Sequence, residues 1–132
     1  TVRYLRTVGP CILQGEDMRV LIAGGRDFTD KETMKNVLAG VPRCSVIISG
    51  TARGADQLGE SWAEARGIAV ERYPADWDTY GKAAGHIRNQ QMLDEGKPDY
   101  VVVFPGGKGS ESMVKKARKA GLNVYTPGWT VL

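Results

Sequence analysis

From Met18 onward, short runs of apolar and β-branched residues alternate with longer segments whose apolar residues recur every three or four positions. The runs predict strands at 19–23, 45–49, 69–73 and 100–104, and the longer segments predict helices between and after them. Strands that alternate with helices through short loops are typical of a parallel sheet covered on both faces. The pattern therefore predicts an α/β fold, a doubly wound, mainly parallel, five-stranded Rossmann-like sheet with helices on both faces.

Helix ends and helix faces make this pattern more specific. Thr29 and Glu32 have the spacing of a capping box. Glycines that suit left-handed C-caps follow the four predicted helices at positions 40, 67, 96 and 121. In the second helix Asp56 is expected to face away from the core. The predicted buried stripe of that helix consists of Ala55, Leu58, Trp62 and Ala65.

Three glycine-rich loops follow the first, second and fourth predicted strands, with the sequences GGRDF at 24–28, SGTARG at 49–54 and PGGKGS at 105–110. In doubly wound sheets, ligands bind at the carboxyl ends of the strands, where the strand order reverses. If the order is 3-2-1-4-5, the three loops converge on one crevice. Each loop alone could be an ordinary tight turn, but their convergence favours an anion site built from backbone N–H groups and glycines.

Side chains of suitable chemistry accompany these loops. Arg53 supplies a guanidinium fork for phosphate or carboxylate, and Ser110 is placed to cap the last helix. Arg88 leaves the border of an apolar helix face and needs a partner, which is either a ligand phosphate or an internal aspartate. The predicted ligand-binding residues are Gly24, Gly25, Arg26, Ser49, Gly50, Thr51, Arg53, Gly54, Arg88, Asn89, Pro105, Gly106, Gly107, Lys108, Gly109 and Ser110.

The segment at 74–85 is predicted to be a long irregular loop, and such loops in compact domains often carry function. Its aromatic residues, Trp77 and Tyr80, either stack on a base or serve in packing. Asn89, on the helix that follows, either fixes a loop or reads a base edge. A nucleotide-like ligand is therefore consistent with the polar and the aromatic residues alike.

Composition narrows the class of protein. At 132 residues, 42% of them hydrophobic and 25% charged, the chain is predicted to form a single domain at 18–132. Residues 1–17 lack strand and helix punctuation and are predicted to be an N-terminal extension, with Met18 as a natural start. A net charge of +3 suits a small anion better than duplex DNA. Cys11 and Cys44 are predicted to be free thiols, which favours a cytoplasmic protein.

The sequence lacks the motifs of several function classes. The dinucleotide fingerprint Gly-x-Gly-x-x-Gly and the Walker arrangement Gly-Lys-Ser/Thr are both absent. The chain has one histidine, His86, and its two cysteines have no metal-ligand spacing. We therefore predict no cofactor and no metal. The apolar runs are too short to span a membrane, so no membrane partner is predicted either.

Three motifs resemble known proteins. The segment SGTARGAD resembles the SG-x-ARG-x-D segment of the DNA-processing protein A family, and HIRNQQM resembles the Arg-Asn helix segment of that family. FPGGKGS is similar to the PGG-x-G-T motif of the Lonely Guy phosphoribohydrolases, which activate cytokinins. Together they resemble the SLOG superfamily, most closely its YspA-type bacterial and phage branch of unknown function. The resemblance implies a Rossmann-like domain, commonly a homodimer, that binds nucleotides or nucleotide-derived ligands without a metal.

One departure from these motifs bears on catalysis. In the phosphoribohydrolases the motif continues to a glutamate that is needed to cleave the N-glycosidic bond, and that position is Met113 here. Arg88 corresponds to the arginine of that chemistry. A nearby carboxylate would have to supply the missing acid. Glu111 does not take the place of that acid directly, because on a helix it lies about 200° around the axis from position 113. The candidate catalytic residues are Arg88, Asp56 and Glu111, with Asp76 and Asp78 as further sources of the acid.

The predicted function is binding of a nucleotide or nucleotide-derived phosphorylated ligand, in sensing or nucleotide metabolism. The alternatives are a nucleoside 5′-monophosphate phosphoribohydrolase and a single-stranded DNA binder that uses Arg53, Arg88 and the basic face at 115–119. Nucleic acid is the less favoured partner because the net charge is modest. A homodimer is predicted because Trp62, the extension and the apolar tail at 126–132 offer surface that a partner would cover. The alternative is a monomer whose extension and tail fold back on its own sheet.

Overall fold

The computed structural model describes residues 18–41 and 44–129. The predicted extension at 1–17, the tail residues 130–132 and Cys11 lie outside the described residues, whereas Cys44 is a free thiol as predicted. Five parallel strands form one sheet in the order β3-β2-β1-β4-β5. This confirms the predicted strand order. The strands are β1 (Met18–Ala23), β2 (Cys44–Ser49), β3 (Ala69–Arg72), β4 (Tyr100–Val103) and β5 (Asn123–Tyr125).

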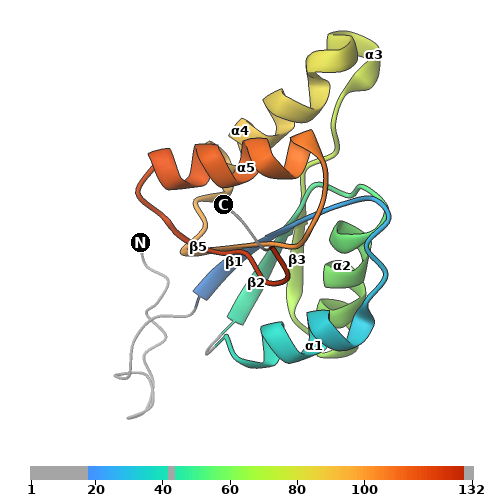
Figure 1. Cartoon of the computed structure of the whole chain (residues 1–132), viewed down its shortest axis with the longest axis vertical. Helices are drawn as coiled ribbons and strands as arrows, with labels where there is room; N and C mark the ends of the chain where they lie inside the picture. Colours follow the sequence, from blue (N-terminus) through green and yellow to red (C-terminus); the bar gives the residue numbers. More distant parts are fainter. Residues whose placement is uncertain (1–17, 42–43, 130–132) are drawn as a thin grey trace.

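Helices cover both faces of the sheet (Figure 1). α1 (Lys31–Ala39) and α2 (Ala55–Ala65) lie on one face, and α4 (Ala84–Gly96) and α5 (Lys108–Lys119) lie on the other. Along β1, Val20 and Ile22 pack in the core beneath α1 and α2, whereas Leu21 and Ala23 pack in the core beneath α4 and α5. Strands buried on both faces need apolar residues at every position, which explains the continuous apolar runs. The doubly wound α/β fold is confirmed.

The segment at 74–85 differs from the irregular loop predicted for it. It contains a helical turn, α3 (Trp77–Tyr80), and a 3₁₀ turn, η2 (Gly81–Ala83), which continues into α4. Asp76 caps α3 because its side chain accepts a hydrogen bond from the backbone N of Thr79. The prediction missed this turn because so short a helix has no apolar periodicity of its own. The helical turns fix Trp77 in place beside the carboxyl edge of the sheet.

The predicted helix ends are partly confirmed. Gly67 and Gly121 adopt left-handed backbone angles, with φ of 71° and 78°, just after α2 and α5. Gly40 does not, and its φ is −84°. Gly96 is instead the buried last residue of α4, where a Cβ would lie 3.2 Å from Ile48, and Lys97 takes the left-handed conformation. At Gly96 tertiary packing overrides the local preference of glycine for a helix end, whereas nothing in the structure explains the conformation of Gly40.

The predicted capping box is wrong by one residue. Asp30, not Thr29, is the N-cap of α1. Its carboxylate accepts hydrogen bonds from the backbone N of Thr33 at 3.0 Å and from the Thr33 hydroxyl at 2.6 Å. These hydrogen bonds, the side-chain one foremost, lower the pKa of Asp30. Aspartate and threonine are both good N-caps, so their order along the chain did not decide between them.

The buried face of α2 is rotated relative to the prediction. Ala55, Gly59 and Ala63 are buried beneath the sheet, whereas the predicted Ala65 is exposed. A Cβ on Gly59 would lie 3.1 Å from Ile22, so small residues let α2 approach β1 closely. Leu58 and Trp62 pack at the border of this contact. The rotation buries Asp56, which was expected to face away from the core.

The described part of the tail is covered by its own domain. The indole Nε1 of Trp129 donates a hydrogen bond to the carbonyl of Val103 at 2.9 Å, and Pro127 is buried. Residues 126–129 therefore do not offer the exposed apolar surface that was expected of them. This removes part of the argument for the predicted homodimer, which stays a prediction.

Candidate functional site

The three glycine-rich loops meet at the carboxyl edge of the sheet. The backbone N of Gly25 donates to the carbonyl of Pro105 at 2.9 Å, and the carbonyl of Gly25 accepts from the backbone N of Ala55 at 3.1 Å. The first loop is thus hydrogen-bonded both to the third loop and to the start of the helix that follows the second. In doubly wound sheets this switch point between neighbouring strands is where ligands bind.

Most of the glycines serve contacts between loops rather than contacts with a ligand. A Cβ on Gly25 would lie 2.7 Å from the carbonyl O of Pro105, and a Cβ on Gly106 would lie 2.6 Å from the N of Gly25. Gly54 has a φ of 83°, and its Cβ would collide with the carbonyls of Gly25 and Arg26. Gly107 and Gly109 differ, because a Cβ added at either glycine would have no atom within 4 Å. Those two glycines leave the start of α5 open.

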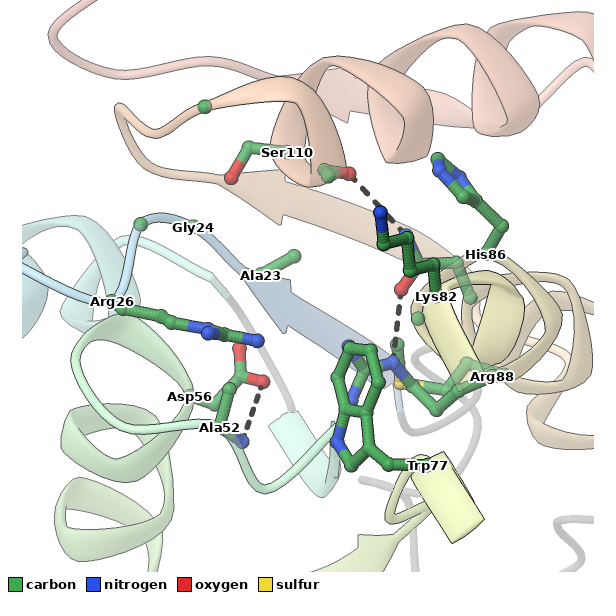
Figure 2. Close-up of a pocket in the computed structure, with 16 residues that line it drawn as sticks. Ala23, Gly24, Arg26, Ala52, Asp56, Trp77, Lys82, His86, Arg88 and Ser110 are labelled. Atoms are coloured by element: carbon green, nitrogen blue, oxygen red, sulfur yellow. Dashed lines mark hydrogen bonds between the residues drawn. The ribbon is translucent and has the colours of Figure 1, made fainter. Parts of the chain in front are cut away.

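A cavity of about 400 Å³ lies beside these loops (Figure 2). Its floor includes Gly24, Gly25 and Ala52 from the first two loops, and its α5 side includes Gly107, Gly109 and Ser110. Basic and aromatic side chains complete it, namely Arg26, Trp77, Lys82, His86 and Arg88. Asp56 is the one carboxyl side chain among the residues that line it.

Arg88 is held at the edge of the cavity by neutral partners. Its Nη1 donates to the carbonyl of Gly50 at 2.6 Å, and its Nε donates to Oδ1 of Asn89 at 3.0 Å. Burial lowers the pKa of Arg88; attraction by Asp56 opposes that shift, and repulsion by Arg26 adds to it. Within the described chain, Arg88 forms no ion pair with a carboxylate. The alternative of a direct internal salt bridge with an aspartate is therefore not what the structure contains.

Arg26 lies on the opposite side of the cavity from Arg88 (Figure 2). Its guanidinium lies 5.7 Å from the centroid of the Trp77 ring, a cation–π contact. Among the residues that the structure describes, it too has no carboxylate partner. Two cations that repel each other across a cavity form a place where an anion is stabilised.

Asp56 is almost fully buried at the start of α2. Its Oδ2 accepts a hydrogen bond from the backbone N of Ala52 at 3.1 Å. Burial raises the pKa of Asp56 to about 6, while the Ala52 hydrogen bond and the charge of Arg88 counteract that rise. A carboxyl group with such a pKa in a cavity is typical of functional sites, because it changes charge near neutral pH.

This pKa predicts how stability depends on pH. The pKa of Asp56 is higher in the folded protein, at about 6, than its ordinary value of 3.8. Its contribution to stability is therefore fully present below about pH 4 and is lost as the pH rises through about 6. We expect Asp56→Asn to raise the free energy of unfolding near pH 7 by about 2 kcal/mol and to change it little near pH 4. Urea titrations of both proteins at the two pH values measure this, and a gain confined to low pH would contradict it.

Some predicted ligand residues have other contacts or lie elsewhere. The Ser49 hydroxyl is buried, donates to Glu60 at 2.6 Å and accepts from the backbone N of Thr51 at 3.0 Å, so it holds the loop. Asn89 lines the main cavity, but its Nδ2 already donates to the carbonyl of Gly109 at 3.3 Å. Ser110 lies in the first turn of α5, where Gly107 is the N-cap. Three predicted residues line a neighbouring cavity and not the main one, namely Gly50, Thr51 and Arg53. Others, including Pro105, Gly106 and Lys108, line neither of these two cavities.

The candidate acids are separated by the fold. Glu111 is exposed and does not line the cavity, and Met113 is fully buried in the core beneath α5. Asp76 caps α3, and Asp78 is exposed. Of the carboxylates named from the sequence, the structure brings Asp56 alone to the cavity beside Arg88.

Lys82 and His86 are lining residues that the sequence interpretation missed. With Asn89 they recur at the spacing of one helix face, but the helix was predicted to begin at about Ala83, one residue after Lys82. Nδ1 of His86 lies 3.2 Å from the Ser112 hydroxyl, which links α4 to α5. Within the described residues, no group of His, Cys, Asp and Glu side chains is arranged to hold a metal ion.

Comparison with known proteins adds the family. A model described as YAcAr: YspA, cpYpsA-related SLOG family matches residues 18–80. The "Gene 61 protein" of Mycobacterium phage D29 is 36% identical over 121 residues, which covers 83% of this chain and 96% of the phage protein. The chain belongs to the YspA, cpYpsA-related SLOG family. The resemblance inferred from SGTARGAD, HIRNQQM and FPGGKGS is thereby confirmed.

The fold of this SLOG protein is also similar to a solved structure, that of DNA processing protein A (DprA) from Streptococcus pneumoniae. The TM-score is 0.70 at 19% sequence identity, and the match covers 88% of this chain and 52% of that chain. The SLOG chain therefore spans about half the length of the DprA chain that it matches. At this identity the likeness concerns the fold. No helix in the described ranges has the length and apolar character needed to cross a bilayer.

Proposed function

We propose that this SLOG domain binds a small phosphorylated nucleoside or a nucleotide-derived ligand in the cavity between the three glycine loops. The observation that carries the proposal is the pair Arg26 and Arg88, which line one cavity, repel each other and form no ion pair with a carboxylate among the described residues. A ligand phosphate would supply the missing negative charge.

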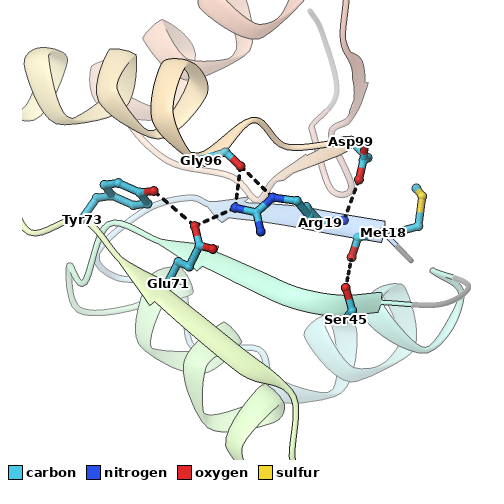
Figure 3. A network of polar contacts seen from close by, with 7 residues as sticks. All are labelled: Met18, Arg19, Ser45, Glu71, Tyr73, Gly96 and Asp99. Carbon is cyan, nitrogen blue, oxygen red and sulfur yellow. Dashed lines mark hydrogen bonds and ion pairs between the residues drawn. The ribbon is translucent and has the colours of Figure 1, made fainter. Parts of the chain in front are cut away.

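Another arginine of the same domain provides an internal comparison (Figure 3). Away from the cavity, Arg19 of β1 donates through Nε and Nη2 to the carbonyl of Gly96, and its Nη2 lies 2.7 Å from Oε1 of Glu71. This half-buried arginine is neutralised by a carboxylate and by the carbonyl end of α4, as a structural arginine should be. The contrast with Arg26 and Arg88 supports a ligand at the carboxyl edge.

The rest of the cavity fits the other parts of a nucleotide. Gly107 and Gly109 leave the start of α5 open, so its backbone N–H groups and its positive dipole end are accessible to a phosphate. Lys82 adds a further positive charge. The Trp77 ring is about half exposed and already carries a guanidinium contact, so it offers a face for a base.

A panel of nucleoside 5′-monophosphates tests the proposal. We expect a monophosphate at about a hundred times its Kd to raise the unfolding temperature by roughly 10 °C, because ligand bound to the folded state stabilises it. The unphosphorylated nucleosides serve as matched controls and are expected to have little effect, because they lack the charge that Arg26 and Arg88 bind. The absence of a shift with every monophosphate would overturn the proposal.

Hydrolysis of the N-glycosidic bond is a second candidate function, and the position of Asp56 favours it. In such a reaction water adds to C1′ of the sugar, and the base leaves with a proton from an acid. Asp56 is the one carboxyl group among the lining residues, and its pKa of about 6 suits proton transfer near neutral pH. Chromatography of the same monophosphate mixtures would reveal free base. Base release that Asp56→Asn does not slow would exclude this role for Asp56.

A further inference from the structure

A second cavity, of about 480 Å³, adjoins the first on the side of the SGTARG loop. The two cavities share Arg26, Ala52, Trp77 and Arg88 as lining residues, so they are adjacent parts of one recess. Arg53 lines the second cavity and not the first. Three arginines therefore surround a space whose lining residues include no acidic side chain.

The arginines of this second cavity are available to a ligand. The Arg53 side chain is 70% exposed, and the one ion pair that it forms among the described residues joins it at 3.5 Å to Asp27, whose side chain is itself 97% exposed. Such a surface pair contributes little and is easily exchanged for another anion. Arg88 lines both cavities, and its Nη1 is anchored to the carbonyl of Gly50. Its position does not depend on a ligand.

The loop that forms the floor of the second cavity is held in a strained conformation. Thr51 has a φ of 65°, which is costly for a β-branched residue. Its backbone N donates to the buried Ser49 hydroxyl, which in turn donates to Glu60, and Glu60 is paired with Arg72 at 3.1 Å. A chain of polar contacts from β3 thus maintains the strain. Strain that the surrounding structure maintains is common at ligand sites.

We propose that the second cavity is a second anion subsite, and that the ligand carries two phosphate groups separated by a sugar, as in a nucleoside 3′,5′-bisphosphate or a 5′-phosphorylated dinucleotide. The inference rests on the proposed function, because the first phosphate occupies the first cavity. Trp77 lines both cavities and offers its ring to the base that is attached to this sugar.

The charge distribution favours a short ligand over a continuous nucleic-acid strand. Beyond Arg53 a third depression is lined by Arg26, Lys31 and Arg53 together with Asp27, so a carboxylate opposes part of its positive charge. The second cavity differs from this depression because no carboxylate is among its lining residues. A long strand would need a longer basic groove and a larger positive charge than the +3 of this chain.

Calorimetric titration with AMP, ADP and adenosine 3′,5′-bisphosphate tests the second subsite. We expect the bisphosphate to bind about tenfold more tightly than AMP, because its second phosphate gains charge-assisted hydrogen bonds. ADP is the control for added charge, because its two phosphates are adjacent; its affinity is expected to exceed that of AMP by less than the bisphosphate's does. Arg53→Gln is expected to remove most of the advantage of the bisphosphate. Arg118→Gln, on the exposed side of α5, removes the same charge away from the cavities and is expected to keep that advantage.

The outcomes separate this inference from the proposed function. If AMP binds and the bisphosphate binds no more tightly, the second subsite is rejected while the proposed function stands; if neither binds, both fail. If Arg53→Gln and Arg118→Gln lower the affinity for the bisphosphate equally, the effect comes from overall charge, and the subsite is rejected. If oligothymidine binds more tightly than the bisphosphate, and its affinity falls steeply with salt, the ligand is a nucleic-acid strand and the two-phosphate ligand is rejected.

Discussion

Replacement of Arg88 by methionine is expected to lower the affinity for a nucleoside monophosphate by about a hundredfold, because the phosphate loses two charge-assisted hydrogen bonds. The substitution also affects Asp56, because the charge of Arg88 lowers the pKa of that carboxyl group. Without that charge the pKa of Asp56 rises further, so more of the carboxyl group is protonated at neutral pH. Calorimetric titration with AMP near pH 7 measures the loss of affinity.

Loss of folding would not explain this result. Methionine keeps the apolar stem of Arg88, and removal of a half-buried cation recovers its desolvation cost, which offsets the lost hydrogen bond to Gly50. The free energy of unfolding is therefore expected to change by no more than about 1 kcal/mol. Arg118→Met is the matched control, because it removes the same charge from an exposed position. Arg88→Met protein that folds and binds AMP as tightly as wild type would show that Arg88 is not a phosphate ligand.

Gly54→Ala is expected to lower the free energy of unfolding by about 4 kcal/mol, from backbone strain together with overpacking. Gly54 has φ 83° and ψ −127°, a region that residues with a Cβ avoid. Its new Cβ would also meet the carbonyl carbon of Arg26 at 2.6 Å. These are backbone atoms, which move only if the first and second loops separate. Urea denaturation measures the effect.

Gly67→Ala separates the two causes of this destabilisation. Gly67 has a φ of 71°, but no atom lies within 4 Å of its added Cβ. Its replacement is therefore expected to cost about 1 kcal/mol, from left-handed strain alone. Equal losses at the two glycines would contradict a steric role for Gly54 between the loops. A smaller loss at Gly54 than at Gly67 would contradict the structure of the loop itself.

The elements of the fold could be predicted from local patterns. Continuous β-branched runs indicate strands buried on both faces, and alternation with amphipathic segments indicates a parallel sheet, because parallel strands need crossover connections. The three loops, with GGRDF, SGTARG and PGGKGS, lie where a doubly wound sheet concentrates its ligands. Arg26 was named as part of the first loop and Arg88 from its place at the border of an apolar helix face, and both line the cavity.

Tertiary structure decided the features that depend on contacts between distant segments. The sequence interpretation relied on the large residues Leu58 and Trp62, but α2 approaches β1 through Gly59, and this rotation buries Asp56 and raises its pKa to about 6. A buried aspartate and an exposed aspartate look the same in a sequence, because burial is a property of the neighbours. Lys82 entered the site because helical turns replaced a predicted loop.

Glycine illustrates the same division. The sequence alone determined that glycine-rich loops would gather at the carboxyl edge, since their places follow from the order of strands and helices. Whether a glycine makes room for a ligand or for another loop depends on what lies opposite its missing Cβ. For Gly25 and Gly54 the opposite atoms are backbone atoms of neighbouring loops, and for Gly107 and Gly109 there are none within 4 Å. Periodicity is a local property of the chain, whereas steric contact arises only after distant segments have packed.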